Sequence, residues 1–321
     1  MSNYLQGRTI HRDVHLTNVA MNYRPEGMIG GEVFPVVPVD KQSNMIKTYT
    51  QADLFRRFDT VRARGQEAKV VEYNVGSDQF FCRNYALKGV VTIEDRVNAD
   101  PVFVRSEENG KVMNVMDSLL LDWDVRVAAK AFATTNVGTS ANVASSWTDY
   151  TNSTPHRDIW TMMDNVQDIT GYRPNYIAFG QAAWKNFRRN NDVIDKALRT
   201  AITGGDRSVS QQEVAAFLEV DQVLVGNGYY NTAAEGIAQS LTPIWGPHVL
   251  VYYRPPTAST ERPSYGYSMR WQAPGIANMG VERHGYDTRR KCEEFEIGYY
   301  QDEKITGSTL GALVTNVTCS Q

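Results

Sequence analysis

The chain has 321 residues, with 33 Lys and Arg against 36 Asp and Glu, and a formal net charge of −3. This length allows one large domain or two modest ones, and an apolar share of 42% is enough to bury a core. The near-neutral charge argues against a dedicated nucleic-acid-binding protein, which usually carries a strong basic excess on one face.

The cysteine and hydrophobic patterns indicate a reducing compartment and no membrane segment. Cys82, Cys292 and Cys319 lie far apart, form no CxxC motif and are odd in number, which predicts free thiols. The N-terminal residues MSNYLQGRTIHRDVHLTNVA lack the apolar core of a signal peptide. No apolar run elsewhere is long enough to cross a bilayer, so we expect no membrane partner.

The first 92 residues are expected to extend away from a compact core. Prolines and a Gly-Gly pair punctuate residues 1–41, which predicts an arm that lies along a neighbour. Residues 42–92 read as a long hairpin, with one arm at 44–51 and a second at 69–73 that resumes over 79–93.

The connection between the two arms, DLFRRFDTVRARGQEAK, is strongly basic. A connection of this length inside a compact domain usually indicates function or mobility, although a solvated loop is the ordinary interpretation. Its basic residues are Arg56, Arg57, Arg62, Arg64 and Lys69.

Residues 106–134 carry the clearest helix signal. Ser106 is a candidate N-cap, and the acidic Glu107 and Glu108 follow in the first turn, where the helix dipole favours them. Asp122 and Asp124 are expected at the solvated edge of this helix. Apolar residues with helical spacing predict one buried stripe: Val112, Val115, Met116, Leu119, Leu120, Trp123 and Val127.

The second half of the chain divides into an α/β part and a β-rich part. Residues 135–154, rich in Asn, Ser, Thr and Gly, predict a loop or a loose hairpin. Helices are predicted at 155–169, 181–200 and 210–220, with strands at 175–179, 222–225 and 248–253, which indicates helices layered on a small sheet. Residues 265–321 predict strands at 268–271, 280–283, 295–300 and 312–317.

The sequence contains no recognisable constellation for catalysis, cofactor binding or metal binding. The motifs GxxxxGK[ST], HExxH and GxSxG are absent, and Gly226-Asn227-Gly228 reads as a tight turn because the rest of a dinucleotide fingerprint is missing. His11 and His15 lack acidic or thiol partners at ligand spacing. Tyrosines gather in the second half, as expected either at protein contacts or in ordinary strands. We therefore expect a protein that is not an enzyme.

The order of the predicted parts resembles the major capsid proteins of tailed bacteriophages, the HK97 fold. KGVVTIEDRVNADP followed by LLLDWDVRVAAKAF resembles the passage from the extended loop of that fold into its spine helix. TGYRPNYIAFGQAAWKNFRRNNDVIDKAL resembles the start of the axial domain, and EEFEIGYYQDEKITGSTLGALVTNV resembles the closing strands of the peripheral domain. The resemblance covers nearly the whole chain.

The resemblance implies an α+β fold and a role for each segment. Residues 1–41 would be the N-terminal arm and residues 42–92 the extended E-loop. Residues 93–154 would form the peripheral domain with its spine helix at 106–134, residues 155–264 the α/β axial domain, and residues 265–321 the return strands of the peripheral domain.

The same resemblance implies function and partners. Copies would assemble as pentamers and hexamers in the host bacterial cytoplasm into the icosahedral shell of a virion, enclosing double-stranded DNA that its inner face contacts non-specifically. A portal protein and a cement or decoration protein would be further partners. Because the chain starts at Met1 with no long segment ahead of the E-loop, we expect a separate scaffolding protein.

The basic E-loop gains a function in such a shell, since arginine forms two-point contacts with carboxylates. We expect it to clamp an acidic patch on the next subunit. The candidate partners are Glu107, Glu108, Glu293, Glu294 and Glu296. Three alternatives stay open. The first is an encapsulin-type compartment with the same fold, which would hold protein instead of DNA. The others are an α/β enzyme with an unrecognised site in residues 155–264, and another virion or tail protein.

Overall fold

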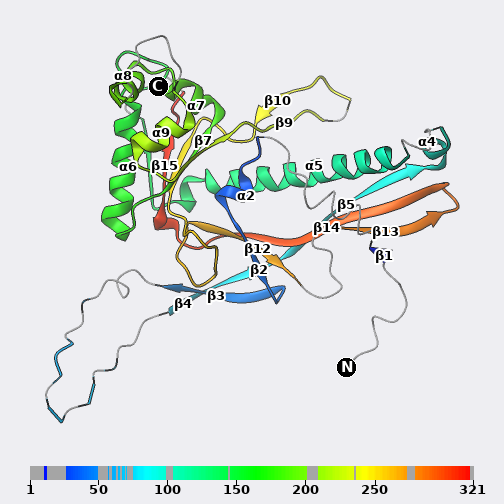
Figure 1. Ribbon diagram of the computed structural model, residues 1–321, viewed down its shortest axis with the longest axis horizontal. Helices are drawn as coiled ribbons and strands as arrows, with labels where there is room; N and C mark the ends of the chain where they lie inside the picture. The colour runs from blue at the N-terminus through cyan, green and yellow to red at the C-terminus, as the bar shows by residue number, and fades with distance from the viewer. Residues whose placement is uncertain are drawn as a thin grey trace.

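The computed structural model shows an elongated molecule with a lobe of helices at one end and a two-stranded ribbon along one edge (Figure 1). No helix in the described part is both long and apolar enough to cross a membrane. The structure describes residues 11–12, 27–49, 57, 60–62, 64–65, 67–68, 70, 75–98, 104–143, 145–200, 209–234, 236–272 and 279–318.

The long axis is built on helix α5 (Val104–Ala131), which at 28 residues is about 42 Å long. The helix begins two residues before the predicted N-cap Ser106, which therefore lies inside it, and ends at Ala131 instead of residue 134. The predicted stripe is confirmed, because Val112, Met116 and Leu119 are buried in one cluster with residues of β14.

A six-stranded sheet lies along α5. Its order is β1-β13-β14-β12-β2. The long strand β14 pairs with β13 over its first half and with β12 over its last residues, and β5 pairs with it along the opposite edge. Helix α5 contacts both β5 and β14. The strands are β1 (His11–Arg12), β2 (Val36–Val39), β5 (Arg83–Thr92), β12 (Gly266–Trp271), β13 (Gly280–Asp287) and β14 (Cys292–Ile305).

A five-stranded sheet forms the core of the helical lobe, in the order β6-β15-β11-β7-β8. Alternate residues bury opposite faces: Ile177 packs in the cluster that includes helix α6, and its neighbour Ala178 packs in the cluster that includes the end of α5. Burial on both faces explains why these strands read as continuous apolar runs. The strands are β6 (Thr139–Asn142), β7 (Tyr176–Gly180), β8 (Gln222–Gly226), β11 (Val249–Tyr252) and β15 (Gly311–Thr315).

Two of these strands come from outside residues 155–264. Strand β6 falls in the stretch predicted to be a loop or a loose hairpin, and β15 falls among the predicted return strands of the peripheral domain. The structure places both strands in the five-stranded sheet instead, where β15 pairs with β11 on one side and β6 on the other. The sequence could not show this, because partners distant in sequence decide which sheet a short strand joins.

Four helices cover the lobe: α6 (Pro155–Thr170), α7 (Gln181–Phe187), α8 (Asn191–Thr200) and α9 (Gln211–Leu218). The capping box predicted for the last of these is present, with Ser210 as N-cap and Glu213 completing it. The single helix predicted over 181–200 is wrong. Buried Asn190 interrupts it, because its side chain donates to Ser153 Oγ at 2.7 Å and accepts from the backbone N–H of Asp192 at 3.0 Å.

Shorter elements complete the chain. The hairpin predicted over 42–92 is shorter than expected, because it contains β3 and β4 alone. Strand β5 turns away at Cys82 and joins the six-stranded sheet. The remaining elements are α2 (Gly30–Val33), β3 (Ser43–Tyr49), β4 (Val75–Phe81), α4 (Ile93–Asn98), η1 (Thr134–Asn136), β9 (Tyr229–Asn231), β10 (Leu241–Pro243) and η2 (Ser308–Leu310).

Candidate functional site

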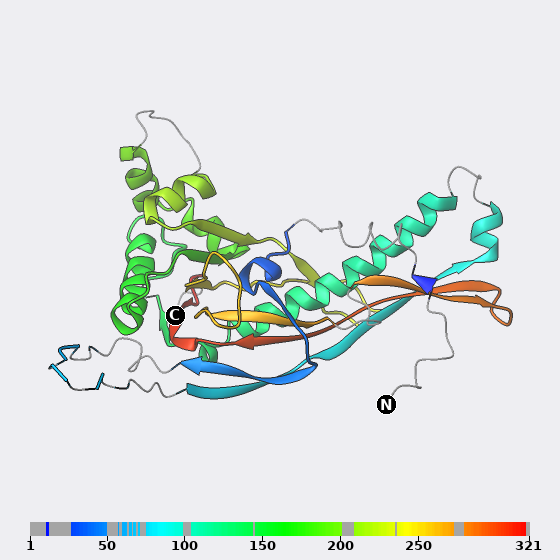
Figure 2. The same ribbon diagram turned by 60° about the horizontal axis from the view of Figure 1, so that its bottom comes forward.

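Strands β3 and β4 form a two-stranded ribbon, and neither pairs with any other strand of the described part of the chain. Strands β3 and β4 pair antiparallel from Ser43↔Phe81 at the root to Tyr49↔Val75 at the outer end. At the root, Cys82 donates its N–H to Gln42 O at 2.9 Å, and Gln42 Nε2 donates to Cys82 O at 3.1 Å. Figure 2 shows this ribbon running along one edge of the molecule.

Strand β14 anchors the ribbon through charged side chains. Lys304 Nζ lies 2.9 Å from Asp78 Oδ1 and donates to Gln79 O at 3.0 Å. The backbone N–H of Phe81 donates to Asp302 Oδ2 at 3.1 Å. The ribbon is therefore tied to the body along β4.

The predicted basic residues are in part placed by the structure. Arg57, Arg62 and Arg64 lie in the connection and are exposed. Arg56 and Lys69 fall outside the described residues.

The predicted acidic partners lie at the opposite end of the molecule, beside β13 and β14, and already contact basic side chains of their own chain. Glu108 lies 3.0 Å from Arg283, and Glu293 lies 3.4 Å from the same guanidinium. Glu294 contacts Lys88 at 3.3 Å and Arg290 at 3.4 Å, and Glu296 contacts His284 at 2.9 Å. The side chain of Glu107 falls outside the described part.

A second charged cluster, not anticipated from the sequence, joins the spine helix to β14. Arg126 Nη2 lies 3.1 Å from Glu303 Oε1, and the guanidinium stacks over the ring of Tyr85 at 3.7 Å. Burial alone would lower the pKa of Arg126, but Tyr299 and Glu303 raise it above its ordinary value. Arg126 and Glu303 line a cavity of about 700 Å³ that also takes in Phe81 at the ribbon root.

Asp124 corrects a prediction, because it is not on a solvated edge but 2% exposed. One carboxylate oxygen accepts the N–H of Gly30 at 2.6 Å, and the other accepts Trp245 Nε1–H at 2.9 Å. Burial raises the pKa of Asp124 to about 6, although both hydrogen bonds oppose the shift. The residue ties α2 and the segment before β11 to the spine helix. Its place four residues after Leu120 and three before Val127 was the signal, since that spacing puts it on the buried stripe.

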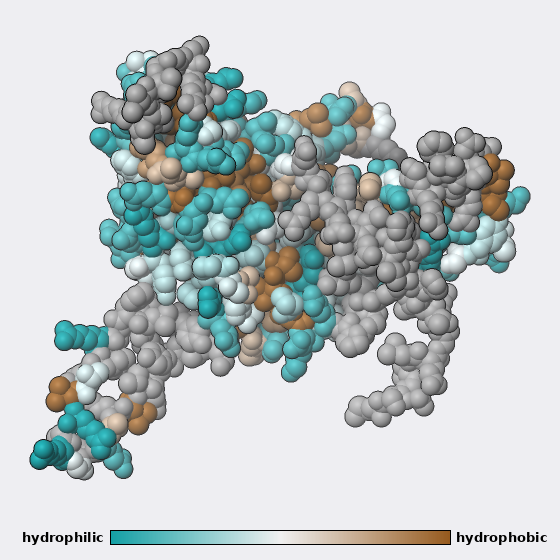
Figure 3. All heavy atoms as spheres, in the orientation of Figure 1, coloured by the Kyte–Doolittle hydropathy of each residue, from teal (hydrophilic) through white to brown (hydrophobic). Residues whose placement is uncertain are grey.

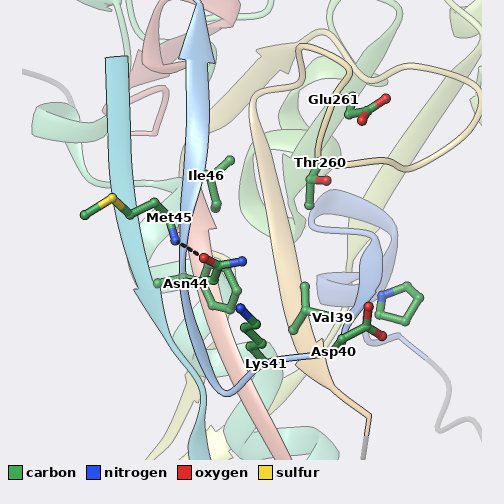
Figure 4. A pocket seen from close by; sticks show the side chains of 10 residues that line it. Val39, Asp40, Lys41, Asn44, Met45, Ile46, Thr260 and Glu261 are labelled. Carbon is green, nitrogen blue, oxygen red and sulfur yellow. Dashed lines mark hydrogen bonds between the residues drawn. The ribbon is translucent and has the colours of Figure 1, made fainter. Parts of the chain in front are cut away.

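A groove of about 370 Å³ lies beside the ribbon root, between β2, β3 and the loop before β12 (Figure 4). Its apolar lining is Pro38, Val39, Ile46 and Phe80. Asp40 and Lys41 lie at one end of the groove and Glu261 at the other.

No cluster of metal-ligating side chains occurs in the part of the chain that the structure describes. His11 lies in β1, and His15 falls outside the described residues. Cys82 and Cys292 are free and buried, as predicted, and burial raises the pKa of Cys82 to about 11. Cys319 falls outside the described residues. Gly226-Asn227-Gly228 joins β8 to β9 and does not lead into a helix.

The clustered tyrosines are mainly core residues. Tyr252, Tyr265, Tyr267 and Tyr299 are fully buried, whereas Tyr229 is exposed on β9. Ordinary strand packing therefore accounts for most of the tyrosine signal in the second half of the chain.

Two curated phage proteins are similar to the chain along almost its whole length. The major capsid protein of Pseudomonas phage JBD67 is 27% identical over 316 residues, covering 96% of this chain and 97% of that protein. The major capsid protein of Burkholderia phage BcepMu is 22% identical over 315 residues, covering 95% of this chain and 96% of that protein. No protein-family model matches.

Solved structures share the fold over nearly all of the chain. A phage-related protein from Bordetella bronchiseptica has a TM-score of 0.75 at 21% identity, covering 98% of this chain and 99% of its own. The capsid of cyanophage P-SCSP1u has a TM-score of 0.60 at 12% identity, covering 97% and 92%. The SrpI encapsulin of Synechococcus elongatus has a TM-score of 0.54 at 11% identity, covering 97% of each chain. These likenesses confirm the predicted α+β, HK97-like fold.

Proposed function

We infer that this chain is a major capsid protein of a bacteriophage, whose copies assemble into the shell of the virion. The observation that carries this function is the match along 96% and 95% of the chain to two phage major capsid proteins, on a fold shared with phage capsids. The role is structural. The architecture agrees with it, because a long spine, a lateral ribbon and a helical lobe suit a tile that contacts several neighbours (Figure 1).

The finer assembly is part of the same proposal. We propose pentamers and hexamers in an icosahedral shell of a tailed phage, with residues 155–264 as the main part of the axial domain and strands β6 and β15 completing its sheet. The shell would enclose double-stranded DNA, contacted non-specifically, and assembly would take place in the host bacterial cytoplasm. A separate scaffolding protein, a portal protein and a cement or decoration protein would be its partners.

The basic connection is proposed to contact an acidic patch of the next subunit. Arg57, Arg62 and Arg64 are exposed at one end of the molecule, and the candidate acids lie at the other, so the contact must be between copies. The contacts that Glu108, Glu293, Glu294 and Glu296 make within their own chain compete with this pairing. Each exposed pair would contribute less than about 1 kcal/mol, and repetition over a shell makes the sum matter.

Charge reversal tests the pairing. Replacing Arg57, Arg62 and Arg64 with Glu should lower the yield of shells, and Arg→Lys at the same positions should retain most of it because the charge stays. Wild-type shells should also weaken as salt is raised, since exposed ion pairs are screened. Normal assembly of the triple Glu variant would rule out the clamp and leave the capsid function intact.

Electron microscopy and sedimentation test the function itself. The chain is expressed alone and with candidate scaffolding proteins from a phage genome, and closed shells or ring-shaped capsomers are expected. A compact monomer or small dimer under every condition would contradict the function. The likeness to an encapsulin makes the shell contents informative, because DNA in native particles supports the virus and a packaged enzyme supports the compartment.

A further inference from the structure

A second projection lies on the long edge opposite the β3–β4 ribbon (Figure 1). It is the hairpin of β9 and β10, which pair in the register Tyr229↔Pro243, Tyr230↔Thr242 and Asn231↔Leu241. Beyond these strands, Asn231 Oδ1 accepts the N–H groups of Ala233 and Ser240, so the tip has its own internal hydrogen bonds.

The tip of this hairpin has the composition of an interface core. From Tyr229 to Pro243 the sequence contains no Lys or Arg, and Glu235 is its single charged residue. Ile237 is 69% exposed and Leu241 58% exposed, and Figure 3 shows hydrophobic colour on this protrusion. Depletion of charge with apolar side chains at the centre is typical of buried contact surfaces. Strands of three residues are also too short to hold a hairpin by themselves, so a partner would add stability.

The geometry of a ring identifies the partner. When copies of one chain are related by rotation, one lateral edge of each copy meets the opposite edge of the next. The β9–β10 hairpin and the β3–β4 ribbon occupy opposite long edges, so they would face each other across such a contact (Figure 1). The groove at the ribbon root offers a surface for it that is partly apolar: Pro38 and Val39 line it, and Ile46 and Phe80, each 4% exposed, contribute the little that they expose.

We propose that the β9–β10 hairpin of one copy docks in the groove at the β3–β4 root of the next copy within a capsomer. Ile237 and Leu241 cover the apolar lining, and the uncharged polar residues of the tip meet the ends of the groove at Lys41 and Glu261. The contact rests on the proposed capsid function and supplies a head-to-tail link that does not depend on the arginines of the E-loop.

Crosslinking tests the contact directly. Ile237→Cys is combined with Thr260→Cys, a residue that lines the groove, in a Cys319→Ser background; the other cysteines, Cys82 and Cys292, are buried. A short bismaleimide applied to assembled particles should give a ladder of linked chains, because each copy is joined to two neighbours. The control pairs Ile237→Cys with Thr161→Cys on the exposed face of α6 and should give no ladder. Assembled particles with no ladder above this control would overturn the proposal.

A second variant tests the energetics. Ile237→Asp with Leu241→Asp should abolish rings and shells while circular dichroism of the subunit stays unchanged, and Ile237→Val with Leu241→Ile should assemble. Normal assembly of the Asp variant would overturn the docking proposal. Failure of the wild-type chain to assemble under all conditions would instead overturn the capsid function, so the two failures are distinguishable.

Discussion

Gly89 on β5 is a position where one added methyl group should destabilise the fold. A Cβ at Gly89 would lie 2.1 Å from Cζ of Phe295 and 2.6 Å from both Cε atoms, well inside van der Waals contact. Phe295 pairs with Gly89 across the β5–β14 ladder and is 5% exposed in the core under α5. Its ring would have to leave that position, so we expect Gly89→Ala to lower the free energy of unfolding by about 1–3 kcal/mol.

Gly110 provides the matched control, because it lies in the middle of helix α5 and a Cβ there would meet no atom within 4 Å. The same Gly→Ala change should raise the free energy of unfolding by about 0.5–1 kcal/mol, since Gly is unfavourable inside a helix. Urea denaturation of the unassembled subunit, followed by circular dichroism, measures both. Adding Phe295→Leu to Gly89→Ala should recover part of the loss. Equal effects at positions 89 and 110 would refute the reasoning.

Three further changes follow from buried polar groups, each measured by urea denaturation of the subunit. The pKa of Asp124 is raised from 3.8 to about 6, so its ionisation opposes folding. The stability advantage of the wild type over Asp124→Ala should therefore fall by roughly 2 kcal/mol between pH 4 and pH 7; a constant difference would contradict this. Asn190→Ala should cost about 1–2 kcal/mol, because it removes the cap of α8, and an unchanged midpoint would contradict that role. Gln301→Leu should cost about 2–3 kcal/mol, because the buried guanidinium of Arg270 loses the Oε1 atom that it contacts at 3.0 and 2.6 Å, and a midpoint equal to that of the wild type would contradict this.

The sequence predicted correctly those elements that are determined by residues a few positions apart. The stripe on α5 follows from helical spacing, and the start of α9 follows from a capping box three residues wide. The boundary between α7 and α8 could not be predicted this way, because no Gly or Pro marks it. Asn190 caps α8 by accepting the N–H of Asp192, and its amide donates to Ser153, a residue 37 positions away.

The contacts of the candidate site could not be predicted for a similar reason, because they depend on which strands pair and in which register. The basic residues between β3 and β4 are visible as a local excess of charge. The acids were harder to interpret, since Glu294 and Glu296 read as unpaired in sequence but face Lys88 and His284 across strands. A one-residue change of register would give each acid a different neighbour, and composition carries no information about register.

The five-stranded sheet has a consequence for the order of events during synthesis. Its central strand β11 lies between β7 and β15, and β15 (Gly311–Thr315) comes at the end of the described chain, about 60 residues after β11. On the ribosome, the lobe would keep one flank of β11 open until those residues emerge from the exit tunnel. A nascent subunit would therefore lack a finished lobe until β15 has left the tunnel, and a chain still on the ribosome would be a poor competitor for a place in a growing shell.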